Sequence, residues 1–178
     1  AIITNDGDRA LARAARDSGV PMILSASSLT KLEDIYEEYP QAWFQGYLPG
    51  DNQRIDAMLK RISLVGFKTL VITVDVPVPG NRENNIRNGF SMPMRITPRV
   101  IWDSAMHPRW LFGTIGRTFL TKGMLYFENM DSTRGPGMWS QNLVRNMDSR
   151  DRLSWKNIEF IRKHWKGHLI IKGLLSPN

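Results

Sequence analysis

Residues 69–75 read Thr-Leu-Val-Ile-Thr-Val-Asp, and this stretch decides the class of fold. A nearly continuous run of β-branched residues is typical of a parallel strand that is buried on both faces. The preceding residues, 51–65, place apolar side chains at helical spacing, and Gly66 stands where a helix ends. Together the two stretches predict one helix–strand unit.

The same order of helix and strand recurs three more times along the chain. We expect helices at 7–18 (ended by Gly19), at 30–40, where Thr30 and Glu33 have the capping-box spacing, and between Ser154 and Gly167. The strands that follow are expected at 20–24, 42–47 and 168–173. Four strands, each preceded by a helix, predict an α/β fold with a parallel sheet and right-handed crossovers.

The alternation stops between Arg82 and Arg152, where proline, glycine, methionine and aromatic residues are dense. So long a stretch without a clear strand is not an ordinary connection. We therefore treat residues 1–178 as a single domain in which residues 84–152 form either an inserted loop with a function of its own or a disordered lid.

Composition excludes several classes of function. The 178 residues are 42% hydrophobic and 23% charged, as in a globular protein, and no apolar run is long enough to cross a membrane. There is no cysteine, and the three histidines are scattered, so we expect no disulfide, no thiol nucleophile and no metal site. The net charge of +7 favours an anionic partner such as nucleic acid, acidic lipid, phosphate or carboxylate, or else reflects a solvated basic surface.

Polar residues stand where each predicted strand stops. They are Ser25, Gln45 with Tyr47, Thr73 with Asp75, and Lys172. Parallel strands end at the same edge of a sheet, which is where α/β proteins bind ligands, so we expect these groups to converge. Lys172 follows Ile170-Ile171, and a lysine at this place is desolvated unless it meets an anion or another acceptor, so we expect such a partner.

Several motifs occur in the order and spacing of a known family. They are Phe44-Gln45-Gly46-Tyr47, Thr73-Val74-Asp75-Val76-Pro77, Gly80-Asn81-Arg82-Glu83, Leu153-Ser154-Trp155-Lys156 and Ile171-Lys172-Gly173. The chain resembles, over its whole length, the FMN-dependent α-hydroxy-acid dehydrogenases and oxidases. His107-Pro108-Arg109-Trp110 most resembles the bacterial respiratory L-lactate dehydrogenase branch, and Gly46 departs from the larger apolar residue common in the family.

The resemblance implies a partial TIM (β/α)8 barrel that holds the second to the fifth family strands, with the insertion after the third strand present. By motif position, Ser25, Gln45, Thr73 and Lys172 would contact the flavin of FMN. Tyr47 and Arg82 would bind the substrate, and Asp75 would stabilise the histidinium that forms when a hydroxy acid is oxidised. The family segments with that histidine and with the phosphate-binding loops do not occur in this sequence, so we expect a fragment that is inactive alone.

The resemblance further implies oxidation of an L-2-hydroxy acid, with L-lactate expected, and transfer of electrons to quinone or another membrane carrier. An oxygen-using oxidase or a mandelate dehydrogenase of the same family stays open, as does a non-catalytic basic half-barrel that binds a membrane or a partner. We expect a homo-oligomer when the protein is full length.

Residues 91–130 interleave bulky apolar side chains with arginine and lysine. This composition suits an anionic membrane surface, and membrane-bound members of the family dock through this loop. We therefore expect a cytoplasmic protein that lies peripherally on the inner face of the cell membrane. The alternative is a lid that packs over the barrel mouth; single-stranded nucleic acid could stack on the same residues, but we expect no nucleic-acid partner.

Overall fold

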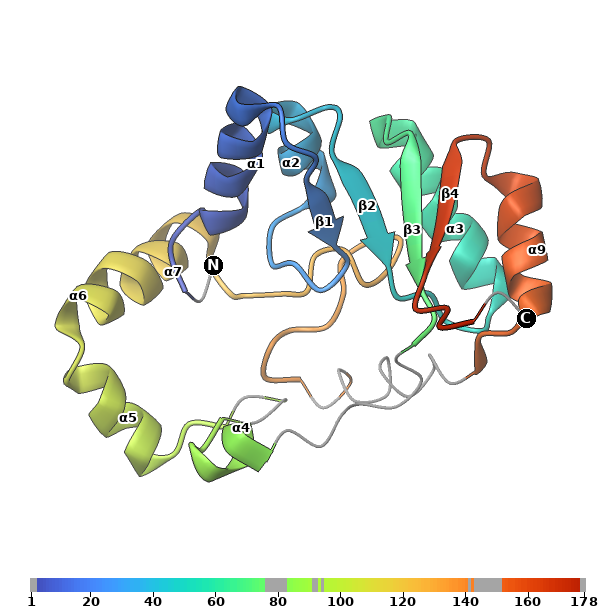
Figure 1. Ribbon diagram of the computed structural model, residues 1–178. Helices are drawn as coiled ribbons and strands as arrows, with labels where there is room; N and C mark the ends of the chain where they lie inside the picture. The colour runs from blue at the N-terminus through green and yellow to red at the C-terminus, as the bar shows by residue number, and fades with distance from the viewer. Residues whose placement is uncertain are drawn as a thin grey trace.

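The sheet at the centre of the fold has four parallel strands in the order β1-β2-β3-β4, as Figure 1 shows. The computed structural model describes residues 3–75, 83–90, 93, 95–140, 142 and 152–176. The strands are β1 (Ile23–Ser25), β2 (Trp43–Gly46), β3 (Thr69–Thr73) and β4 (His168–Lys172). Every residue of β3 is buried, as the run of β-branched residues predicts.

A helix precedes each strand, and the helices cover one face of the sheet. They are α1 (Gly7–Ser18), α2 (Leu32–Glu38), α3 (Asn52–Val65) and α9 (Trp155–His164). Because α1 contacts α2, α2 contacts α3 and α3 contacts α9, the helices follow the same order as the strands. Phe44, Ile62 and Ile72 are fully buried in the main apolar core between the two layers. The predicted α/β fold is confirmed.

Local chemistry sets most of the element boundaries. Gly19 and Gly66 end α1 and α3 with φ angles of 66° and 111°, a backbone region that favours glycine. The Asp51 carboxylate caps α3 by accepting two backbone N–H groups of its first turn. β1 starts three residues later than expected, since the Val20 N–H still bonds to a carbonyl of α1 and Pro21 has no N–H to offer a neighbouring strand.

The start of α2 differs from the prediction. The capping box expected from Thr30 does not form, and α2 begins at Leu32 without a side-chain cap from its own N-cap residue. Asn129 satisfies this end instead: its Oδ1 accepts the Leu32 N–H at 2.8 Å, and its Nδ2 donates to the Thr30 carbonyl at 2.8 Å. A buried side chain that offers both an acceptor and a donor replaces the local cap.

Asn129 belongs to the 125–139 segment, which two arginines of α3 hold in place. Arg61 donates to three backbone carbonyls of residues 128–133 at 2.7 to 3.0 Å and to both Glu33 carboxylate oxygens at 2.8 Å. Arg54 pairs with Asp131 at 2.8 Å. The insertion is therefore attached firmly to α2 and α3 at this point.

The Arg61–Glu33 pair makes stability depend on pH. The Arg61 guanidinium, hydrogen-bonded to the Glu33 carboxylate, holds the pKa of that carboxyl below its usual range. A pKa lowered by folding contributes stability above the unfolded-state value, and this contribution is lost as pH falls through the folded-state value. We therefore expect the urea midpoint to differ between wild type and Glu33→Gln at pH 7, and the difference to shrink at pH 3. Glu37→Gln, at an exposed position of α2, is the control; a Glu33 difference that stays constant with pH would contradict the assignment.

The rest of the insertion forms a helical arm, defined as the described residues between 83 and 122. It contains α4 (Glu83–Arg87), α5 (Pro98–Ala105), α6 (Pro108–Trp110), the π-helix η1 (Leu111–Gly116) and α7 (Arg117–Lys122). The arm extends away from the sheet and returns to α1 (Figure 1), where Lys122 pairs with Asp6 and the Thr118 hydroxyl donates to Asn5 at 3.1 Å. Within the parts of the insertion that the structure describes there is no strand, as expected, apart from the isolated bridge between Tyr126 and Gly137.

Candidate functional site

Four of the predicted site residues form one polar row across the carboxyl ends of the strands. Ser25 lies in register with Gln45, and Gln45 Nε2 donates to Thr73 Oγ1 at 2.9 Å in a buried hydrogen bond. Thr73 in turn lies in register with Lys172. The four groups, one from each strand, therefore lie together at one edge of the sheet, as expected.

The row lies on the inner face of the sheet, the face opposite the helices. In each strand the row residue directly follows a side chain that packs into the helix-side core: Leu24, Phe44, Ile72 and Ile171. Successive side chains of a strand point to opposite faces, so all four row residues point away from the helices. The sequence order of apolar and polar residues at the strand ends thus places the polar groups on one surface.

The Lys172 side chain is 57% exposed. It does meet an acceptor: the Asp75 carboxylate lies 3.2 Å away. Asp75, which the family resemblance places beside a histidinium, therefore has Lys172 as its partner in the described structure.

The three histidines of the chain lie away from this row. His107 is in the helical arm, His164 stacks on Phe160 with the ring centroids 4.0 Å apart, and His168 begins β4 at the end opposite Lys172. Arg82 lies outside the described residues. In the described part of the chain no group of three potential metal ligands gathers.

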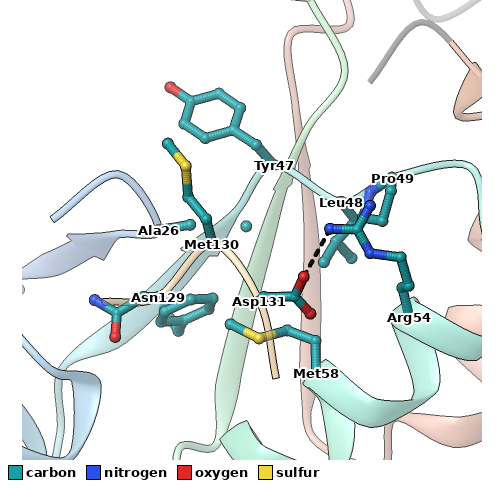
Figure 2. Close-up of a pocket in the computed structure, with 11 residues that line it drawn as sticks. Ala26, Tyr47, Leu48, Pro49, Arg54, Met58, Asn129, Met130 and Asp131 are labelled. Carbon is teal, nitrogen blue, oxygen red and sulfur yellow. Dashed lines mark hydrogen bonds and ion pairs between the residues drawn. The ribbon is translucent and has the colours of Figure 1, made fainter. Parts of the chain in front are cut away.

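Tyr47 follows β2 at the edge of a small cavity, about 10 Å³, that has room for one water molecule. Gly46 lines it from β2, Leu48 from the loop after β2 and Met58 from α3, and Met130 lines it from the 125–139 segment. Figure 2 shows the Tyr47 and Met130 side chains extending in the same direction from this cavity. The cavity borders Gly46, where the family carries a larger side chain.

Sequence reasoning missed Asn129, Arg61 and Met130. Nothing local to Asn129 marks it as the cap of a helix that begins 97 residues earlier. Likewise, an arginine in an amphipathic helix reads as a solvated side chain, whereas Arg61 reaches three carbonyls of the distant segment. Met130 lies next to Asn129 in this segment, so the same contacts help to place it beside Tyr47.

The fold and the polar row define the class of protein: a section of a parallel β/α barrel that presents polar groups at the carboxyl ends of its strands, the edge where barrels bind ligands. The family model described as FMN-dependent dehydrogenase matches residues 1–178. The chain belongs to this family, and the resemblance noted from the motifs is confirmed.

Individual relatives agree with the family. The chain is 33% identical over 171 residues to (S)-mandelate dehydrogenase of Pseudomonas putida, covering 96% of this chain and 42% of that protein. It is 34% identical over 175 residues to L-lactate dehydrogenase of Alcaligenes faecalis, covering 97% and 45%. The solved structure of the monotopic membrane protein (S)-mandelate dehydrogenase matches with a TM-score of 0.78 and 34% identity, covering 96% of this chain and 44% of that one. The chain spans less than half the length of these relatives, in keeping with a partial barrel.

Proposed function

We propose that the protein to which this chain belongs oxidises an L-2-hydroxy acid with FMN, that L-lactate is the substrate, and that electrons pass to quinone or another membrane carrier. The observation that carries the proposal is the polar row of Ser25, Gln45, Thr73 and Lys172 on one face of a barrel section. Family membership and the similarity to L-lactate dehydrogenases support the same reaction.

The row fits a flavin by the chemistry of its groups. Two hydroxyls, one amide and one ammonium offer both donors and acceptors, which match the alternating donors and acceptors on the polar edge of the ring. FMN would supply the acceptor for the two electrons that leave the hydroxy acid. Lys172 would hold a positive charge where negative charge accumulates on reduction.

The substrate side would be built from residues at the same rim. Tyr47 would donate a hydrogen bond to the substrate, and Arg82 would pair with its carboxylate. Asp75 would stabilise the protonated base that a further part of the protein supplies. Met130 would limit the space beside Tyr47, so it is a candidate for selecting substrates by the size of their side chain.

The test uses the protein encoded by the complete reading frame. We expect it to bind FMN, with the absorbance of a bound flavin, and the flavin to bleach when L-lactate is added without oxygen. (S)-mandelate is the second candidate substrate, favoured by the similarity to (S)-mandelate dehydrogenase. If only mandelate bleaches the flavin, mandelate replaces lactate as the proposed substrate. If oxygen reoxidises the reduced flavin faster than quinone does, the protein is an oxidase. If the protein binds no FMN, the enzyme proposal is wrong and the non-catalytic binding module is the reading that stands.

The helical arm supports peripheral membrane binding. Its exposed apolar side chains include Trp102 at 68%, Phe112 at 73% and Leu120 at 90% exposure. Arg99, Arg109 and Arg117 on the same arm are also exposed. No helix in the portion of the chain that the structure describes is long and apolar enough to span a membrane. Burying such side chains beside cationic ones at an anionic interface is favourable, at about 1 kcal/mol for each cation near the headgroups.

Removing apolar side chains from the arm should weaken vesicle binding. We expect Trp102→Ser with Phe112→Ser to reduce co-sedimentation with vesicles rich in anionic lipid at least tenfold, because about 3 kcal/mol of apolar burial is lost. Leu64→Ser, which changes an 87% exposed residue of α3, is the matched control. Equal binding by all variants would favour the lid over the docking surface.

A further inference from the structure

An ion pair closes the polar row at its β4 end. Lys172 Nζ lies 3.2 Å from Asp75 Oδ2 and 3.4 Å from Oδ1. The backbone fixes this approach, because the Val74 N–H donates to the Lys172 carbonyl at 3.0 Å just beyond the last residue of β3. Asp75 thus stands two residues after Thr73, beside the lysine that would face the flavin.

Gly173 makes room for this pair. Its φ is 105°, in the region that favours glycine, and a Cβ built on it would lie 2.5 Å from the Asp75 Cβ and 2.9 Å from the Asp75 backbone nitrogen. Both neighbours are parts of one residue close to its backbone, so they cannot turn aside as the end of a long side chain could. Any larger residue at position 173 would force Asp75 out of its present place beside Lys172.

We propose that Asp75 tunes the redox potential of the bound flavin through Lys172, and that Gly173 is the positioning residue that holds the two together. The inference rests on the proposed function. It gives Asp75 a role in addition to the stabilisation of a protonated base.

The direction of the effect follows from charge. A cation near the flavin favours the reduced form, because reduction adds negative charge there. The Asp75 carboxylate partly cancels the field of the Lys172 ammonium, so the pair lowers the potential relative to an unpaired lysine. Removing the carboxylate should raise the potential.

The test measures the midpoint potential of FMN in the full-length protein, by equilibration with reference dyes of known potential. We expect Asp75→Asn to increase the ratio of reduced to oxidised flavin at a fixed potential about tenfold, equivalent to about 30 mV for a two-electron couple. The same substitution is then made in a Lys172→Met background. If Asp75 acts through Lys172, the change there should be less than half as large.

Gly173→Ala separates the pair without removing a charge. We expect it to raise the potential in the same direction as Asp75→Asn, by a smaller amount. Gly113→Ala is the matched control, because a Cβ at Gly113 in η1 would meet no atom within 4 Å, and we expect it to leave the potential unchanged.

The outcomes separate this inference from the function on which it rests. A full-length protein that binds no FMN defeats the proposed function, and the inference with it. If FMN binds and is reduced by a hydroxy acid, the function stands. The inference is then overturned by an Asp75→Asn potential that is unchanged or lower, or by equal shifts with and without Lys172. The Asp75 variants decide the matter even where Gly173→Ala does not fold.

Discussion

Replacing Lys172 by methionine is expected to slow flavin reduction by the hydroxy acid about 10²- to 10³-fold in the full-length protein, the loss typical for a group that stabilises developing charge. Methionine keeps the length of the side chain and removes the ammonium from the polar row, where Thr73 lies in register with it. The rate is measured by stopped-flow bleaching of the flavin under saturating substrate.

FMN binding should largely survive this substitution, because Ser25, Gln45 and Thr73 keep their positions. Lys172→Arg should recover part of the rate, since it restores the charge with a different shape. Lys166→Met is the matched control, because Lys166 is exposed, precedes β4 at the end opposite Lys172, and donates from its Nζ to the Lys163 carbonyl. A Lys172→Met rate within about threefold of wild type would remove the lysine from the reaction.

The elements that sequence reasoning predicts well are those with a local cause. β3 is a run of β-branched residues, and its burial on both faces needs no knowledge of its neighbours. Gly19 and Gly66 end their helices because the required backbone conformation suits glycine wherever the rest of the chain goes. The convergence of the polar row also has a simple cause, since parallel strands end at one edge.

The features that escape prediction depend on residues far apart in the sequence. Thr30 and Glu33 have the spacing of a capping box, yet Glu33 is engaged by Arg61 and the helix start by Asn129. Lys172 has an acceptor that the local sequence does not name: Asp75 becomes its partner through the register of β3 with β4. In each case a partner on another element competes successfully with the local one.

Asn129→Ala is expected to lower the free energy of unfolding by about 2–4 kcal/mol, although the residue is neither apolar nor part of the polar row. Asn129 is fully buried, and its amide satisfies the Leu32 N–H and the Thr30 carbonyl at 2.8 Å each. Leu32 and Thr30 are also buried, at 0% and 1% exposure, so water does not replace the lost partners easily. A buried polar group left without a partner costs about 1–3 kcal/mol. The substitution leaves the Leu32 N–H without its side-chain acceptor and leaves the Thr30 carbonyl with only the longer hydrogen bond from the Ser28 hydroxyl, at 3.3 Å.

Asn129→Asp separates the two hydrogen bonds, because it keeps the acceptor for the Leu32 N–H and removes the amide donor to the Thr30 carbonyl. When the new carboxyl is ionised, it is also a buried negative charge. Relative to wild type, the free energy of unfolding of Asn129→Asp should therefore be higher at pH 4 than at pH 7. Asn84→Ala, at an exposed position in α4, is the control and should change stability by less than about 0.5 kcal/mol. Urea unfolding with an unchanged slope gives each value. An Asn129→Ala loss no larger than that of Asn84→Ala would mean that the insertion does not hold α2, and that Met130 has no fixed place beside Tyr47.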